Sequence, residues 1–151
     1  MKFPLHAAVL ICMLAACDPE SSQMDDLLQR ADQGEAAAQY RLSVIYATGD
    51  GLSQDDTESA RWLQLAAAQG YADAQHNLGV LFILGQGVPQ DYVLSHMWLN
   101  LAASRQDGEE ADDSATARDS LAAKMTPEQI AESQALAREW KPKTWEELQP
   151  E

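Results

Sequence analysis

Histidines, serines and paired acids are the residues of this chain that could do chemistry, and their spacing decides whether they do. His76 and His96 fall on different predicted helices, and neither has a cysteine or a cluster of acids at metal-ligand spacing. No serine stands in a nucleophile elbow, and no Ser–His–Asp set is indicated. The acid pairs at 109–110 and 146–147 lie in polar segments, which are typical of ordinary surface acids. We therefore expect no catalytic site, no metal site and no cofactor.

The thiol of Cys17 stands in a more specific setting, at the end of the segment MKFPLHAAVLICMLAAC. Lys2 gives this segment a basic start, and residues 5–16 are apolar apart from His6. An apolar run of this length is too short to span a membrane, and small residues end it, which is typical of a secretory signal. We therefore exclude residues 1–16 from the fold as a signal peptide.

The last four residues of that segment, Leu14-Ala15-Ala16-Cys17, resemble the lipobox of bacterial lipoproteins. The resemblance implies a diacylglyceryl group on the Cys17 thiol, cleavage just before this residue and acylation of the new amino terminus. Several acyl chains hold a protein at a membrane far more firmly than one. The alternative is an ordinary signal peptide with an incidental cysteine, which would leave a soluble periplasmic protein.

Residues 17–23 are polar with one proline and are predicted to form a tether between the lipid and the fold. In enteric-type sorting, an aspartate at the position of Asp18 resembles a signal for retention in the inner membrane. We therefore expect the protein on the periplasmic side of the inner membrane, with the outer membrane as the alternative. Cys12 would leave with the signal, so no cysteine would remain for a disulfide.

The acidic balance of the chain argues against two kinds of partner. Ten basic and twenty-four acidic side chains give a formal net charge of −14. Nucleic acid requires a basic surface, and so does electrostatic binding to anionic lipid, yet the sequence contains no Lys/Arg cluster. We expect a monomer that binds no nucleic acid and contacts a membrane only through its lipid.

An internal repeat must position whatever site the protein has, because residues 34–69 align with residues 70–105 without a gap. The two segments share an opening Gly-x-Ala-x-Ala-Gln, a central Gly-x-Gly and a closing Trp-Leu-x-Leu-Ala-Ala. Tryptophans at repeat-fixed positions are expected to pack between helices rather than to stack on a ligand. The signature residues are Gly49, Gly51, Trp62, Gly70, Gly85, Gly87 and Trp98.

Each repeat is predicted to form two helices separated by the Gly-x-Gly turn. In the first half, apolar residues at positions 38, 42, 45 and 46 form one stripe of an amphipathic helix. Two glycines after such a run end a helix, and Asp55 or Asp91 is placed to cap the next one, with Glu58 as a reciprocal partner in the first copy. The second half is apolar on two adjacent faces, which is typical of a helix packed between neighbours.

These two segments resemble Sel-one-like repeats, which are relatives of the tetratricopeptide repeat. The matching features are the small-residue opening, the glycine turn, the aspartate after it and the tryptophan before the closing alanines. The second copy departs at its end, where Arg105-Gln106 replaces Gln-Gly. The resemblance implies an all-α solenoid of stacked antiparallel helix pairs, with about seven helices and no sheet.

Partial units flank the two full repeats, so the helical repeat domain is expected to span residues 24–140. Residues 22–33 match the end of a repeat and predict the second helix of a truncated leading unit. Residues 107–140 predict a polar capping helix pair, whose second helix begins with Thr126, Pro127 and Gln129. Residues 141–151 are predicted to be a frayed tail, and the sequence leaves open whether Trp145 docks back.

Contacts with a partner are expected where the two repeats differ, because a repeat keeps its joints and changes its contacts. The resemblance places the first helix of each pair on the concave face. The exposed positions that differ there are the candidate partner-binding residues. They are Tyr40, Arg41, Asp73, His76 and Asn77.

Together these features predict a non-enzymatic protein–protein interaction or scaffold module, anchored by lipid in the bacterial cell envelope. Its partner would be another protein or a peptide. A cell-wall-related or hydrolytic enzyme is the alternative, and so is an unlipidated soluble periplasmic adaptor. An enzyme would need a buried titratable pair, and the sequence indicates none.

Overall fold

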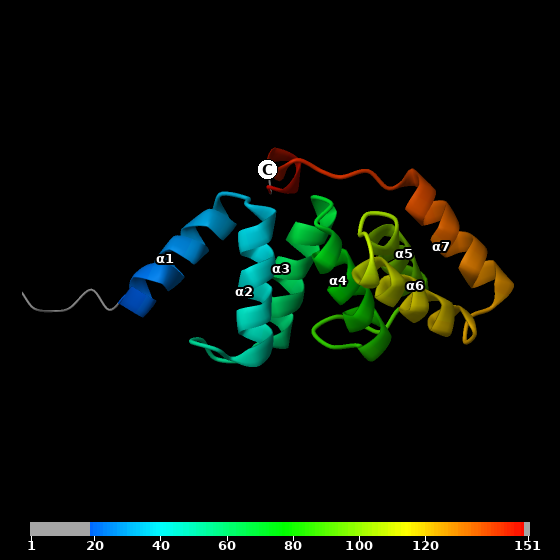
Figure 1. Cartoon of the computed structure of the whole chain (residues 1–151), viewed down its shortest axis with the longest axis horizontal. Helices are drawn as coiled ribbons and strands as arrows, with labels where there is room; N and C mark the ends of the chain where they lie inside the picture. Colours follow the sequence, from blue (N-terminus) through cyan, green and yellow to red (C-terminus); the bar gives the residue numbers. More distant parts are fainter. Residues whose placement is uncertain (1–18, 150–151) are drawn as a thin grey trace, which may run out of the picture.

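The computed structural model describes residues 19–149, and this range folds into a curved row of helices with no strand (Figure 1). The helices are α1 (Pro19–Asp32), α2 (Ala36–Thr48), α3 (Asp56–Ala68), α4 (Ala72–Leu84), α5 (Tyr92–Ala103), α6 (Glu109–Ala122), α7 (Pro127–Glu139) and α8 (Trp145–Leu148). The predicted all-α solenoid is confirmed. Within the described range, no helix has the length and apolar character needed to cross a membrane.

Successive helices from α1 to α6 pack against one another, so each repeat contributes one helix pair to the stack. The predicted capping pair differs from a regular pair, because α6 and α7 each pack mainly against α5. Two buried serines tie these helices to the repeats before them. Ser114 on α6 lies 2.7 Å from the Nδ1 of His76 on α4, and Ser133 on α7 lies 2.8 Å from the Nδ1 of His96 on α5.

The core of the described residues consists of two hydrophobic clusters in which alanines lie among larger side chains, so neighbouring helices approach closely at the alanines. Trp62 is 5% exposed and lies among the residues of the first cluster, which is where a packing residue belongs. The first cluster contains Leu27, Ala31, Ala38, Leu42 and Trp62. The second contains Ala60, Leu63, Ala66, Ala67, Ala74, Leu78, Phe82 and Val88.

The helix ends largely follow the sequence signals. Gly49 and Gly85 end α2 and α4 in the left-handed conformation. Asp55 caps α3 by accepting hydrogen bonds from the backbone of Thr57 and Glu58. The predicted reciprocal bond from Glu58 is not made, because its carboxylate pairs with an arginine one turn further along α3.

A buried glutamine fastens each repeat to the helix before it. Gln39 donates from Nε2 to the carbonyl of Ala31, and Gln75 donates in the same way to Ala67. These carbonyls belong to last turns of helices, which have no partner within the helix. The glutamine of the opening motif is therefore a joint residue, and both copies are fully buried.

The amino-terminal boundary differs from the predicted tether. Helix α1 begins at Pro19, so residues 19–23 are helical. Proline suits the first turn of a helix because the N–H that it lacks would have no partner there.

The carboxyl-terminal segment is not a frayed tail, because residues 140–148, here called the strap, return along the solenoid (Figure 1). Lys143 donates its backbone N–H to the carbonyl of Ala68 at 2.9 Å. Pro142 lies beside Gly70 at the α3–α4 joint, and the Trp145 ring lies against Gly34 at the α1–α2 joint. The strap therefore contacts two successive joints of the stack.

Candidate partner-binding site

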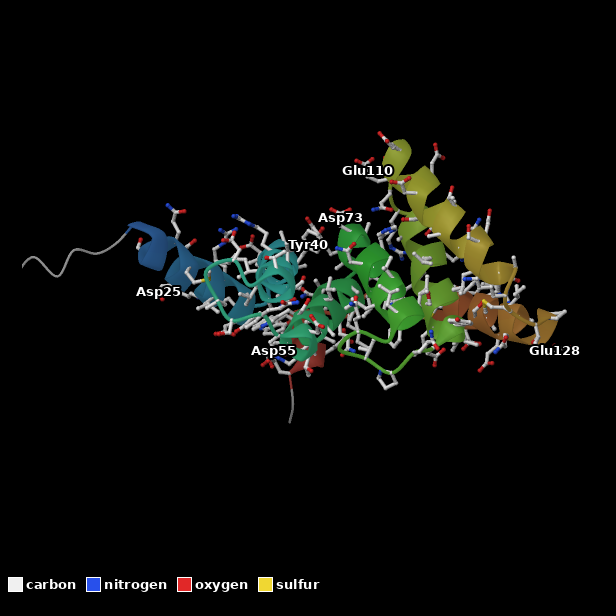
Figure 2. All side chains as sticks on the ribbon, turned by 90° about the horizontal axis from the view of Figure 1, so that it is seen from below. Asp25, Tyr40, Asp55, Asp73, Glu110 and Glu128 are labelled. Atoms are coloured by element: carbon white, nitrogen blue, oxygen red, sulfur yellow. The ribbon has the colours of Figure 1, made fainter. Side chains whose placement is uncertain are left out.

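Four of the five candidate partner-binding residues meet at one cavity of about 300 Å³. Helices α2, α4 and α6 each contribute to its wall. Tyr40, Asp73 and Glu110 come from these three helices and lie on the same side of the ribbon (Figure 2). The lining residues are Tyr40, Asp73, His76, Asn77, Gln106, Glu110 and Asp113, and they define what we call the concave cavity.

A chain of hydrogen bonds links four side chains in and behind this wall. Gln106 donates from Nε2 to Oδ1 of Asp73 at 2.9 Å. Ser114 donates to Oε1 of Gln106 at 2.7 Å, and its oxygen lies 2.7 Å from Nδ1 of His76. The chain connects α4 to α6 and closes one side of the cavity.

The direction of this chain follows from the charge of Asp73. A carboxylate can only accept, so the amide nitrogen of Gln106 must face it and the amide oxygen must face Ser114. The single hydroxyl hydrogen of Ser114 then goes to Gln106, and Nδ1 of His76 must donate to Ser114. In the neutral ring this leaves Nε2 of His76 as an acceptor.

Tyr40 forms the opposite side of the cavity. Its hydroxyl accepts from Nδ2 of Asn77 at 3.3 Å, and its ring lies 5.2 Å from that of Tyr71 with a tilt of 40°. Burial raises the pKa of Tyr40, and the negative charge of Asp73 raises it further. The phenol therefore stays neutral near neutral pH and offers an aromatic face beside a hydroxyl.

Arg41 does not join this group. It lies with Arg30 and Ile45 on the wall of a separate cavity of about 910 Å³ between α1 and α2. Its repeat equivalent, Asn77, faces the preceding helix pair through its bond to Tyr40. The same position on α2 therefore faces α1, where the leading unit has no first helix.

Sequence reasoning missed the residues that α6 and the linker before it supply. Gln106 stands where the earlier joints have Gly34 and Gly70, so its side chain is an addition to the repeat pattern. A glutamine in place of the glycine of the other joints is visible in the sequence and could have marked Gln106 as a candidate. Glu110 and Asp113 could not be assigned to the cavity, because the capping unit has no repeat partner to compare with.

Two serine–histidine pairs in the described residues resemble parts of a catalytic triad, but their serine hydroxyls are buried away from solvent. Ser114 and Ser133 are both fully buried. Ser133 also donates its hydroxyl hydrogen to the carbonyl of Ile130. Neither hydroxyl can reach a substrate, so both pairs hold helices together. The described residues also contain no group of three or more potential ligands that could hold a metal ion.

Buried His96 makes the stability of the protein depend on pH. Burial lowers its pKa from the ordinary 6.5, and the positive charge of Arg118 acts in the same direction, against a smaller opposite effect of Asp119. The pKa is thus lower in the folded than in the unfolded chain. The contribution of neutral, buried His96 to the free energy of unfolding is therefore fully present above about pH 6.5. This contribution is lost as the pH falls from there through the folded pKa of His96.

We expect His96→Asn to reduce this pH dependence, because asparagine cannot take up the proton and can still donate to Ser133. Urea unfolding near pH 7 and near pH 5, followed by circular dichroism, measures it. The wild type should lose more stability on acidification than the variant does. Equal losses in both proteins would show that His96 does not titrate on unfolding.

The remaining predicted residues take structural or undescribed positions. Gly70 lies at the α3–α4 joint, and Trp98 packs its ring 6.0 Å from that of Trp140. Cys17 and Asp18 lie outside the described residues. The signal peptide and the lipid anchor therefore stay predictions.

Comparison with known proteins places these features in a family. The Sel1 repeat matches residues 36–71 and 72–107. No curated protein matches significantly in sequence.

Two solved structures are similar to this chain. One is a protective antigen of uropathogenic Escherichia coli strains with an SLR fold, at 26% identity and a TM-score of 0.73 over 87% of this chain. The match covers 29% of that protein, which is much longer. The other is a Sel1 repeat protein from Oxalobacter formigenes, at 30% identity and a TM-score of 0.51, with 75% of this chain and 98% of that protein covered. Given the two matched repeats and this relative, the chain belongs to the Sel1 repeat family.

Proposed function

We propose that this protein is a non-enzymatic adaptor, anchored by lipid in the bacterial cell envelope, that holds a segment of another protein in the concave cavity. Sel1 repeat proteins are generally protein-interaction modules. For this chain, the observation that carries the proposal is that four of the five candidate residues, which differ between the repeats, line one cavity. Residues that the repeats share are instead taken up by joints and core.

The size of the cavity limits what it holds. A volume of about 300 Å³ lies at the lower end of the range for ligand pockets and accommodates one or two side chains. An extended segment of a partner can place a side chain there and lay its backbone along α2 and α4.

Site-specific crosslinking in living cells tests this proposal. A photoreactive phenylalanine analogue at Tyr40 should trap a partner protein, because this ring lines the concave cavity. The same analogue at Tyr92, at the start of α5 and outside the cavity, is the matched aromatic control. Equal trapping at both positions, or none at Tyr40, would contradict a binding role of the cavity.

The anchor is proposed at Cys17, from the lipobox-like segment before it. Cys17→Ser should move the protein from the membrane to the soluble fraction of the envelope, and the first peptide of the mature wild type should carry the mass of its lipid. The position of Asp18 favours the inner membrane, which density separation of the two membranes tests. If the wild-type protein is soluble and its first peptide carries no lipid mass, the proposed anchor is wrong, but the proposed adaptor role is unaffected.

A further inference from the structure

The wall of the concave cavity consists mainly of hydrogen-bond acceptors. Asp73 on α4 faces Glu110 and Asp113, which lie three residues apart on α6. None of the residues described as lining this cavity is a lysine or an arginine. The salt bridges found in the described residues do not include any of these three carboxylates.

The directed hydrogen bonds of the wall add further acceptors. Asp73 uses Oδ1 to bind Gln106, which leaves Oδ2. Asn77 donates from Nδ2 to Tyr40, which leaves its Oδ1 as an acceptor. The cavity therefore offers more acceptors than donors, and an occupant that supplies several N–H groups would match it.

We infer that the concave cavity takes a positively charged side chain of the partner segment, and that an arginine suits it better than a lysine. This inference rests on the proposed function. A guanidinium carries five N–H donors in one plane, which can reach carboxylates on α4 and α6 together. Its flat face can also stack on the ring of Tyr40, which a compact ammonium does less well. A carboxylate or phosphate would meet like charge and few donors.

Peptide selection with a pair of charge-matched variants tests the inference. Random heptapeptides displayed on phage are selected on the full-length protein in detergent. Retained peptides should be enriched in arginine, then lysine, and replacing the arginine by uncharged citrulline should weaken binding by roughly tenfold or more. Glu110→Gln with Asp113→Asn should cause a similar loss.

The control variant is Glu109→Gln with Asp112→Asn, which removes the same charge from exposed positions of α6 outside the cavity. It should change affinity by no more than about twofold. Peptides retained at the cavity without arginine or lysine, or equal losses in both variants, would overturn the inference and leave the proposed function standing. A selection that retains nothing above an uncoated surface would contradict both.

Discussion

Gly87→Ala is expected to destabilise the protein far more than Gly51→Ala, although the two glycines occupy the same place in successive repeats. Both have a positive φ, +66° and +81°, which costs an alanine about 1–2 kcal/mol. A Cβ on Gly87 would also overlap the carbonyl oxygen of Asp56 and lie 2.6 Å from its carbonyl carbon. At Gly51 the nearest atom is the terminal methyl of Met24, at an ordinary 3.4 Å.

The difference arises because the turn of the second repeat packs on a full preceding helix pair. Backbone cannot move aside as a flexible side chain can, so we expect Gly87→Ala to cost about 3 kcal/mol or more and Gly51→Ala about 1–2 kcal/mol. Urea unfolding of the two variants and the wild type measures both values. Equal losses would mean that this turn is not a rigid joint between repeats.

Trp140→Ala should release the strap and lower the free energy of unfolding by about 2 kcal/mol. The ring of Trp140 meets that of Trp98 edge to face at 6.0 Å, and the guanidinium of Arg105 lies 4.5 Å from its centre. These contacts fix the point where the strap leaves α7. The rest of the strap is held by the backbone hydrogen bond of Lys143 to Ala68 and by the packing of Trp145 against Gly34.

Lys141→Ala is the matched control, because this exposed strap residue should change stability by less than about 0.5 kcal/mol. Hydrogen exchange should show faster exchange of the backbone N–H of Lys143 in Trp140→Ala but not in Lys141→Ala. If Trp140→Ala is as stable and as protected as its control, the strap is not held by this ring.

The strap also explains why the second repeat ends differently from the first. In the first repeat, Gln69 donates to Oε1 of buried Gln39 at 2.8 Å. Its counterpart in the second repeat is Arg105, whose guanidinium lies over Trp140 instead. Oε1 of the equivalent Gln75 is consequently buried and has no hydrogen-bond partner among the residues that the structure describes. The second repeat therefore lacks the glutamine–glutamine hydrogen bond of the first repeat, and in its place Arg105 contacts the strap through Trp140.

The repeat made most of the fold predictable. Because each unit appears twice, the helix ends at Gly49 and Gly85 and the caps at Asp55 and Asp91 could be read from their recurrence. The strap could not be predicted in this way. The strap contacts residues far from it in the chain, at the α1–α2 and α3–α4 joints. No local sequence pattern in residues 140–148 predicts these contacts.

The candidate site was predictable only in part, for a related reason. Comparison of the repeats singled out Tyr40, Asp73, His76 and Asn77, which the structure brings to one cavity. It also singled out Arg41, which faces α1 because the first repeat has no complete unit before it. The α6 side of the cavity belongs to the capping helix pair, which has no second copy in the sequence with which it can be compared.

The central claim is that the unshared residues of the second repeat make the binding surface, and exchanging them for those of the first repeat tests it most directly. The exchange variant carries Asp73→Ala, His76→Tyr and Asn77→Arg, and the control carries Gln86→Asp and Pro89→Ser in the turn. Both should unfold cooperatively, because the hydrophobic clusters and the Gln75 joint are untouched. The exchange variant should be the less stable of the two, because it loses the hydrogen bonds that Asp73 and His76 make toward α6. With the photoreactive analogue at Tyr40, the control should still trap its partner and the exchange variant should not. Trapping at wild-type strength by the exchange variant would contradict the account.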